Sequence, residues 1–196
     1  MADITQLILD DHVWFRGQFT ALDDLRARQP LDPDALREVW RPLAARLDVH
    51  AIAEEEIFYP QLLEHGEHPE DETLDAIGDH NDIRDGVHDA NRHPVGSQAW
   101  WEAVGRARAA NDEHMAEEER EGLADFRQSA TTGLRESLGK RFAEFVESHP
   151  TTRGLDTADK EPRDYVREIE REIDQPSDTA GHGAVGSLGI GSLKER

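Results

Sequence analysis

The chain contains no cysteine among its 196 residues. This absence excludes disulfide bonds, zinc sites built on thiolates, iron–sulfur clusters and thiol nucleophiles. Long apolar runs are also missing, since no segment approaches the run of about 18 apolar residues that a helix needs to span a bilayer. Any metal bound by this chain must therefore be held by nitrogen and oxygen ligands.

Signals for β-structure are missing as well. No stretch alternates between apolar and polar residues, and no hairpin turn sequence occurs. The N-terminus, Met-Ala-Asp-Ile-Thr, lacks the basic region and the long apolar segment of a secretory signal. We therefore expect an all-α protein located in the cytoplasm.

Basic residues are few relative to acidic ones, with 22 Lys and Arg against 43 Asp and Glu and a formal net charge of −21. Such a surface repels the phosphate backbone of nucleic acids and anionic lipids, and no basic stripe counteracts this repulsion. We therefore expect neither nucleic acid nor a membrane as a partner. The acidity is interpreted as the solvated surface of a helical protein.

Apolar residues recur at steps of three to five in several long segments, which is typical of amphipathic helices with one buried face. The second segment begins at Pro33, with Asp32 placed as its cap, and ends at Gly66. Pro60 lies near that end, where a kink is possible, and Ser97 can cap the fourth segment. The expected helices cover about residues 3–29, 33–65, 70–92 and 97–127, followed by shorter ones at 131–148 and 161–174.

Four long helices joined by short loops predict an up-down-up-down four-helix bundle. The additional C-terminal helix at 131–148 is expected to close a flank or an open end, and we assign residues 1–150 to this domain. Residues 151–196 then hold a short charged helix and a Gly- and Ser-rich tail that we expect to be flexible. The tail contains a small repeat, Gly186-Ser-Leu-Gly-Ile-Gly-Ser-Leu193.

One histidine occupies the apolar face of each long helix: His12, His50, His80 and His114. In two helices a glutamate follows four residues later, Glu54 after His50 and Glu118 after His114, so each pair shares one helix face. A lone inward histidine is more often a hydrogen-bonded core residue than a ligand. Four of them with two carboxylates would cost about 1 to 3 kcal/mol for each unpaired group, which favours a metal site over a structural core.

These motifs resemble the hemerythrin-like family, also called the hemerythrin HHE cation-binding domain. The resemblance covers about residues 1–127 and rests on the six residues in order, with the two pairs inside His-x-x-x-Glu-Glu-x-x-Phe-Tyr-Pro and His-x-x-x-Glu-Glu. Members are four-helix bundles that hold two non-heme irons near the bundle axis. The resemblance implies that the four histidines are terminal ligands, that Glu54 and Glu118 bridge the metals, and that the cofactor is an oxo- or hydroxo-bridged di-iron centre. The ferritin-like bundles match less well, because their Glu-x-x-His motif does not occur here.

The third helix departs from the oxygen-carrying hemerythrins, which have a second histidine one turn after the third-helix ligand. Here that place is Arg84, which stays protonated and cannot ligate. We expect Arg84 to be a salt-bridged surface residue rather than one that holds an anion beside the metals. His88 lies two turns beyond His80, about 12 Å along the helix axis, and is a less favoured ligand candidate.

The expected ligands leave the centre incompletely coordinated. Of about twelve positions on two six-coordinate irons, two bridging carboxylates fill four, four histidines four and the oxo or hydroxo bridge two. Water, Glu55, Glu119 or Tyr59 can fill the two that remain. Glu119 stands at the interval that the oxygen carriers use for their bridging carboxylate, but symmetry with the first His-x-x-x-Glu motif favours Glu118.

Two open positions suit redox turnover better than reversible oxygen carriage, for which one end-on site suffices. We therefore expect a di-iron protein that binds or reduces dioxygen, peroxide or nitric oxide, with catalase-like turnover of peroxide as the best fit. An alternative is an oxygen- or iron-responsive sensor or storage module that signals through its C-terminal tail to a protein partner. A metal-free interaction bundle is a third interpretation. Ligand type alone leaves iron, manganese and zinc open, so that iron follows from the resemblance.

Overall fold

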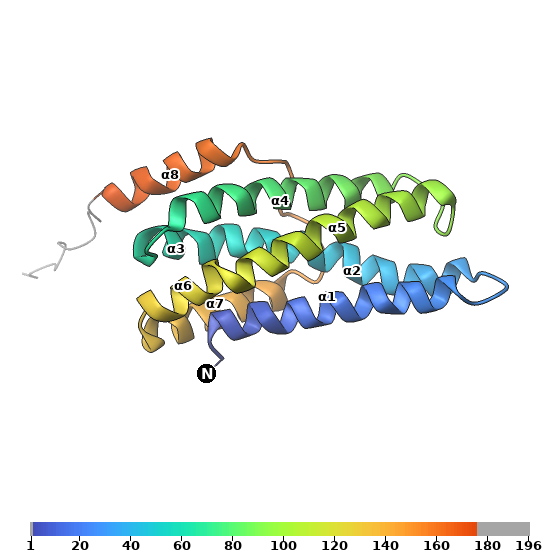
Figure 1. Ribbon diagram of the computed structural model, residues 1–196, viewed down its shortest axis with the longest axis horizontal. Coiled ribbons are helices and arrows are strands. Elements are labelled where there is room, and N and C mark those ends of the chain that lie inside the picture. The colour runs from blue at the N-terminus through green and yellow to red at the C-terminus, as the bar shows by residue number, and fades with distance from the viewer. Residues whose placement is uncertain (1, 176–196) are drawn as a thin grey trace, which may run out of the picture.

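The computed structural model describes residues 2–175, and every regular element in this range is helical (Figure 1). The elements are α1 (Ile4–Arg26), α2 (Pro33–Ala53), the π-helical turn η1 (Glu54–Phe58), α3 (Tyr59–His65), α4 (Pro69–Ala90), α5 (Gln98–Arg120), α6 (Gly122–Ser129), α7 (Thr132–Ser148) and α8 (Pro162–Asp174). The all-α prediction is confirmed. The Gly- and Ser-rich tail, with its repeat at 186–193, lies outside the described residues.

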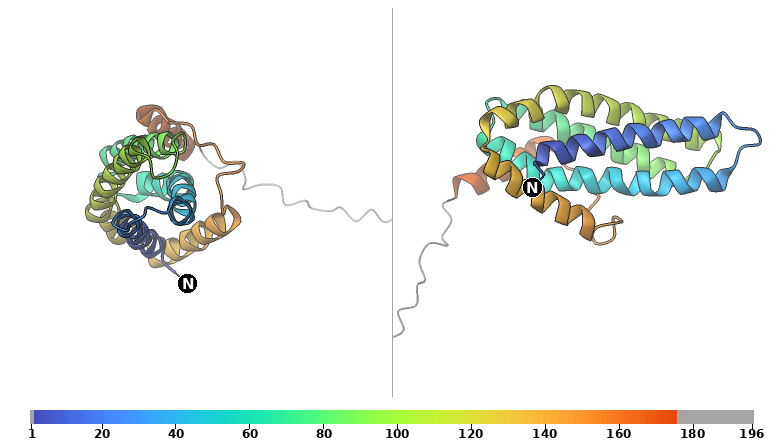
Figure 2. Two further views of the ribbon diagram at one scale, coloured as in Figure 1. Left: turned by 90° about the vertical axis from the view of Figure 1, so that its right-hand side faces the viewer. Right: turned by 90° about the horizontal axis from the view of Figure 1, so that it is seen from below.

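Four long rods form the bundle: α1, the continuous rod of α2, η1 and α3, then α4, and then α5. The end-on view in Figure 2 shows them around a common axis, and short connections make successive rods run in opposite directions. The predicted up-down-up-down four-helix bundle is therefore confirmed. Its core consists of two apolar clusters, one around Phe58 and Ile77 and the other around Phe15 and Trp100. The inward histidines lie in a polar layer between these clusters.

Helix starts follow the capping residues that the sequence suggests. Asp32 accepts hydrogen bonds from the first backbone N–H groups of α2, whose first residue is Pro33. Ser97 does the same for α5. Such caps satisfy donors that have no partner within the helix, which fixes where each rod begins.

The second rod changes its winding over η1. The N–H of Tyr59 donates to the carbonyl of Glu54, five residues earlier, whereas an α-helix uses a step of four. The next donor in this register would be residue 60, a proline without an N–H. The π turn thus accommodates Pro60 where the sequence suggests a kink. Glu54 and Glu55, at the start of this turn, are both buried.

The fourth rod is shorter than predicted. The sequence pattern predicts a helix over 97–127, but α5 ends at Arg120 and α6 begins at Gly122. Between them Glu121 has φ −113° and ψ −79°, away from the usual helical values. The chain changes direction there, and α6 packs against η1 and α3 through the rings of Phe126 and Phe58.

The helices α4 and α5 come into backbone contact at Gly86. A Cβ atom built on Gly86 would lie 2.6 Å from the backbone nitrogen of Ala107, closer than real Cβ atoms approach. Glycine is therefore required for this contact. The same two helices carry His80 and His114, so their close approach sets the separation of these two rings.

Two further helices cover the bundle. The helix α7 packs on α1, α2 and η1, buries Phe142, and uses Gly139 to make room for the backbone of Ala2. It closes a flank, as predicted. The helix α8 packs on α3 and α4 through Tyr165 and Val166, while the division of the chain at residue 150 stays a prediction. Within residues 2–175, no helix combines the length and apolar character that crossing a bilayer would require.

Candidate metal centre

The four inward histidines come from four different helices and meet in the polar layer. His12 lies on α1, His50 on α2, His80 on α4 and His114 on α5, and each is at most 4% exposed. The Nε2 atoms of His80 and His114 are 3.3 Å apart. The ring centroid of His12 lies 5.5 Å from that of His50 and 6.5 Å from that of His114. The structure thus brings together in one cluster the four rings that the sequence pattern singles out.

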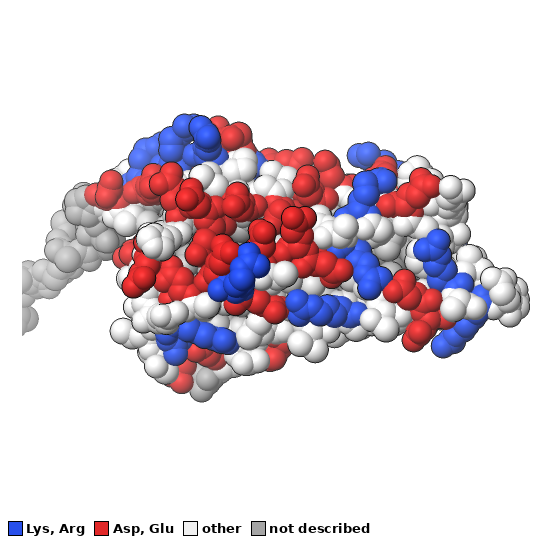
Figure 3. Space-filling model, viewed as in Figure 1, with Lys and Arg blue, Asp and Glu red and all other residues white. Residues whose placement is uncertain are grey.

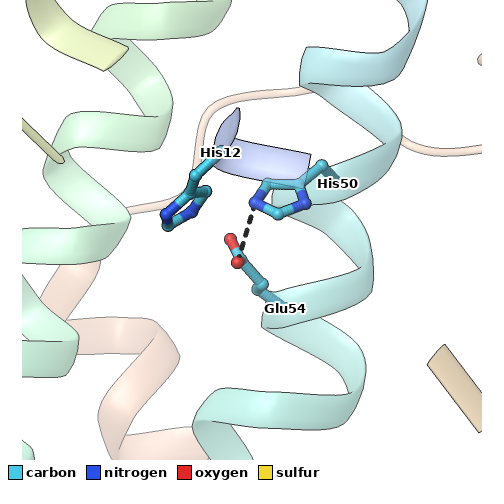
Figure 4. A group of neighbouring side chains, drawn as sticks. All are labelled: His12, His50 and Glu54. Carbon is cyan, nitrogen blue, oxygen red and sulfur yellow. Dashed lines mark ion pairs between the residues drawn. The ribbon is translucent and has the colours of Figure 1, made fainter. Parts of the chain in front are cut away.

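Glu54 lies between these histidines. Its Oε1 is 2.9 Å from Nε2 of His50, while its Oε2 is 3.3 Å from Nε2 of His80 and 3.9 Å from Nε2 of His114. Figure 4 shows His12 and His50 beside this carboxylate. Two groups of side chains could each hold an ion, and Glu54 belongs to both: His12, His50 and Glu54, and Glu54, His80 and His114. We call them the His12 half and the His80 half.

Glu118 faces the layer from α5. Its Oε2 lies 3.3 Å from Nε2 of His12 and 4.0 Å from Nε2 of His114. Its Oε1 accepts a hydrogen bond of 3.0 Å from the hydroxyl of Tyr59. Glu118 therefore reaches one histidine of each half, whereas Glu54 reaches one of the His12 half and both of the His80 half.

A further carboxylate contacts the outer side of each imidazole, at Nδ1. The pairs are Asp11 with His50, Glu55 with His80, Asp79 with His114, and Glu119 with His12. The distance is 2.9 Å in three pairs and 3.6 Å for Asp79. Each of these outer carboxylates comes from the preceding rod of the bundle, and α5 supplies the one for α1. An Nδ1–H directed at a carboxylate leaves the Nε2 lone pair free to face inward, which is how ligating histidines are oriented.

Most of the inward atoms have no hydrogen-bond partner. Nε2 of His12, Nε2 of His50, both oxygens of Glu54 and Oε2 of Glu118 are buried and unpaired. The contact of 2.9 Å between His50 and Glu54 is close but lacks hydrogen-bond geometry. Buried polar atoms are normally paired or bound to a metal. Imidazole nitrogen with carboxylate oxygen is a donor set for iron, manganese or zinc, so these residues fit a metal site.

The carboxylates favour protonated imidazoles when no cation is bound. Burial lowers the pKa of His50, but the charge of Glu54 and the hydrogen bond with Asp11 raise it to about 10. Burial likewise lowers the pKa of His114, and the contacts with Asp79 and Glu54 raise it to about 10. Burial raises the pKa of Glu54, yet the charge of His50 and the surrounding imidazoles hold it well below its usual range. A cation entering the layer would displace these protons.

A family model for the hemerythrin HHE cation-binding domain matches residues 3–126, which contain all six inward residues. The chain belongs to the hemerythrin HHE family. Comparison with curated proteins gives no match, and comparison with solved structures gives none either. The resemblance read from the motifs is therefore confirmed at the level of the family. The matched hemerythrin HHE domain ends within α6, so α7 and α8 lie beyond it.

Arg84 stands where the oxygen-carrying hemerythrins have their fifth histidine, and its position corrects one expectation. A surface residue is predicted, but the side chain is fully buried. Its Nη2 donates to Oε1 of Glu55 at 2.5 Å, so the expected salt bridge is present. The Glu55 carboxylate is buried as well, and its charge compensates the buried guanidinium. Arg84 thus holds the outer carboxylate of His80.

The remaining candidate ligands lie outside the centre. Glu119 pairs with Nδ1 of His12 and with Arg16 instead of facing inward. His88 is directed at Asp48, 3.8 Å away, and its side chain is 38% exposed. In this hemerythrin HHE domain, Glu118, four residues after His114, is therefore the acid of the second motif that faces inward.

A small cavity lies beside His114. Its volume is about 30 Å³, room for one or two water-sized molecules. Its walls include Tyr59, His114 and Glu118. A rim of carboxylates surrounds it, formed by Glu72, Asp75, Asp79, Glu117 and Glu121. This rim belongs to an acidic face that extends over α4 and α5 (Figure 3).

Aromatic rings close the other side of the centre. The ring of Phe15 packs edge-on against His50 with centroids 5.1 Å apart, and Phe142 from α7 does so at 5.9 Å. Both phenylalanines are buried. The His12 half is thus covered by apolar groups, whereas the His80 half borders the cavity.

Sequence reasoning misses two of the outer carboxylates, Asp11 and Asp79. A signal exists, because each directly precedes an inward histidine and therefore lies about 100° around the helix, at the edge of the buried face. From that edge it reaches the next rod of the bundle. The contacts of Lys160 and Tyr165 with Glu55 have no comparable local signal.

Proposed function

We propose that this domain holds two non-heme iron ions, one in each half of the polar layer. The ligands would be His12 and His50 for one ion, His80 and His114 for the other, and Glu54 and Glu118 as bridges. The observation that carries the proposal is the placement of Glu54, whose two oxygens face histidines of different halves. A hydrogen-bonded core residue would have partners for these buried oxygens, and they lack them.

Iron fits this donor set. Imidazole and carboxylate also suit manganese and zinc, so the choice of iron rests on membership of the hemerythrin HHE family. Bound iron would supply electron transfer and affinity for dioxygen, peroxide or nitric oxide. The protein would fix the ions, select reactants by size and keep protons at defined atoms.

The cavity beside His114 restricts what can reach the centre, because about 30 Å³ admits only molecules the size of dioxygen, nitric oxide or peroxide. At its wall, burial and the charges of Glu118 and Glu54 raise the pKa of Tyr59 well above its usual value. Tyr59 therefore keeps its proton and donates it to Glu118 in a hydrogen bond. We infer catalase-like dismutation, in which one peroxide is oxidised to dioxygen and a second is reduced to water, so no further reductant is needed.

Metal analysis of protein grown in iron-supplemented medium tests this proposal, together with the absorption spectrum in air. We expect about two irons per chain, and iron should raise the melting temperature because it binds the folded state. Glu54→Ala and His114→Ala should each lower the iron content and that gain in melting temperature. His149→Ala, at the end of α7, is the matched control and should do neither. A wild-type protein with no metal, or with a single zinc, would refute the di-iron centre, and failure to release dioxygen from peroxide would refute the turnover.

A sensor or storage role is the second candidate, and one set of contacts favours it. Lys160 and Tyr165, which follow the bundle in sequence, both contact Glu55. Because Glu55 is the outer carboxylate of His80, a change at the centre can be transmitted to the C-terminal segment. Under this function, iron loading should alter hydrogen exchange of the amides in α8. Peroxide turnover with unchanged exchange there would favour the enzyme.

A further inference from the structure

The segment that precedes α8 is fixed to the bundle next to a predicted metal ligand. Asn81 directly follows His80, and its side-chain amide donates to the backbone carbonyl of Lys160 at 2.7 Å. Its oxygen accepts from the N–H of Lys160 at 3.0 Å. Arg84 donates to the same oxygen at 3.3 Å. The backbone of Lys160 is thus held in register with the helical turn that carries His80.

Tyr165 supplies a donor that the second rod lacks. Its hydroxyl donates to the backbone carbonyl of Glu55 at 2.5 Å. In the π register of η1, this carbonyl would pair with residue 60, but Pro60 has no N–H. A buried carbonyl without a partner is costly. The contact therefore stabilises the turn that directs Glu55 inward.

Lys160 holds the side chain of the same residue. Its Nζ forms an ion pair of 2.7 Å with Oε2 of Glu55. The other oxygen, Oε1, accepts from Arg84 and lies 2.9 Å from Nδ1 of His80. Glu55 is thus held by hydrogen bonds at its backbone carbonyl and at Oε1, and by an ion pair at Oε2.

We propose that Lys160 and Tyr165 are positioning residues for the metal centre, acting through Glu55 on the ring of His80. We name these two residues the C-terminal clasp. The inference rests on the di-metal function proposed above. Both residues lie beyond residues 3–126, the stretch that matches the family model. A segment outside the family domain thus completes the support of a ligand inside it.

The C-terminal clasp acts on one half of the centre. In the other half, Asp11 pairs with Arg46 and Glu119 with Arg16, so these outer carboxylates are held by arginines of the bundle itself. Loss of the clasp should therefore weaken the binding of the ion in the His80 half and leave the binding of the ion in the His12 half unchanged. A variant that only destabilises the fold would weaken the binding of both ions.

Titration of the full-length, metal-free protein with Co²⁺ against a competing chelator tests the clasp, because visible absorption follows each bound ion. The test variants are Lys160→Met, which keeps most of the apolar stem, and Tyr165→Phe, which removes only the hydroxyl. We expect each variant to lower the affinity for one of two Co²⁺ ions by about tenfold and to leave the affinity for the other unchanged. Lys160→Arg should restore most of the lost affinity.

Two controls separate positioning from packing. Lys140→Met removes an exposed lysine that pairs with Glu144, and it should bind both ions as the wild type does. Val166→Ala loosens α8 without removing a hydrogen bond and should lower the melting temperature without selecting one ion. The exchangeable Nδ1–H proton of His80, shifted by bound Co²⁺ in the NMR spectrum, should exchange faster in the clasp variants alone.

Several outcomes would overturn the clasp. Wild-type affinity for both ions in Lys160→Met and Tyr165→Phe would do so while leaving the metal centre intact. Equal weakening of both ions, as expected of a merely destabilised protein, would also do so. A wild-type protein that binds no Co²⁺ would refute the proposed metal centre and the clasp with it.

Discussion

At the scale of single residues, each inward histidine is held by two acids with different positions. One carboxylate, Glu54 or Glu118, faces Nε2, and an outer carboxylate faces Nδ1. Contacts at both ring nitrogens hold each imidazole in one orientation. The ring can then neither flip nor exchange its two nitrogens without breaking a contact. This orientation is established before any cation arrives, which lowers the cost of ordering the ligands.

The pH dependence of stability follows from the two raised histidine pKa values. His50 and His114 have pKa values of about 10 in the folded protein, against 6.5 for an unperturbed imidazole. Their charged forms therefore stabilise the metal-free fold fully below about pH 6.5, and this contribution is lost as the pH rises through 10. We expect the melting temperature of the metal-free protein to fall between pH 6.5 and 8.5. The gain on adding Co²⁺ should grow over the same range, because fewer protons must be displaced.

Calorimetry at several pH values would check this prediction. His50→Gln should flatten the dependence on pH, whereas the control His149→Ala, at the end of α7 and away from the polar layer, should not. A gain from Co²⁺ that is constant or shrinks with rising pH would show that protons and metal do not compete at these rings.

The sequence predicts the inward residues well because they interrupt a helical period. A histidine or glutamate in line with Phe15 or Leu47 is recognisable at once. The outer carboxylates are harder, since Asp11 and Asp79 sit beside the apolar line, where acids are also common on solvated faces. The predicted surface position of Arg84 is wrong for a different reason. Its burial depends on the partner charge of Glu55, which comes from another rod and is not visible in the local sequence.

At the scale of elements, helix starts are predicted more accurately than the breaks within a rod. Caps such as Asp32 and Ser97 are local and visible in sequence. The break at Glu121 has Gly122 as its local signal, but α5 and α6 together read as one amphipathic period up to about residue 127. The packing of α6 against α3 determines where the helix breaks, and such tertiary packing overrides local propensity.

The contact between α4 and α5 gives a prediction at this scale. Gly86→Ala should destabilise the protein by about 1 to 3 kcal/mol, because the new methyl group would overlap the backbone of Ala107. Gly78→Ala, on the same helix, meets nothing within 4 Å and should stabilise it by about 0.5 to 1 kcal/mol. Denaturant titration of both variants measures the two effects. A gain in stability from Gly86→Ala would mean that the helices do not touch there.

At the scale of the whole molecule, the acidic surface opposes the compact state. The net charge is −21, and carboxylates gather on the face over α4 and α5 (Figure 3). Like charges at this density repel one another and raise the local concentration of cations. The same face contains the rim of the cavity beside His114.

Salt should therefore stabilise this protein. Between about 0.02 and 0.5 M NaCl the Debye length falls from roughly 20 to 4 Å, so repulsion across the acidic face is screened. We expect stability to rise by about 1 kcal/mol, or about 2 to 4 °C in melting temperature for a chain of this size. Asp82→Lys with Asp85→Lys, both exposed on α4, should raise the melting temperature at low salt and reduce its salt dependence. A melting temperature that falls with salt would contradict this account.

The arrangement of the outer carboxylates also bears on how the fold can be divided. The sequence reads as two copies of one motif, His-x-x-x-Glu, each preceded by a helix with one inward histidine. Cutting the bundle between these copies would keep Asp11 with His50 and Asp79 with His114. It would separate Glu55 from His80 and Glu119 from His12, because these pairs connect one copy to the other. The centre is thus not modular: each half of the chain would lose the outer carboxylate of one of its histidines, despite the repetition in its sequence.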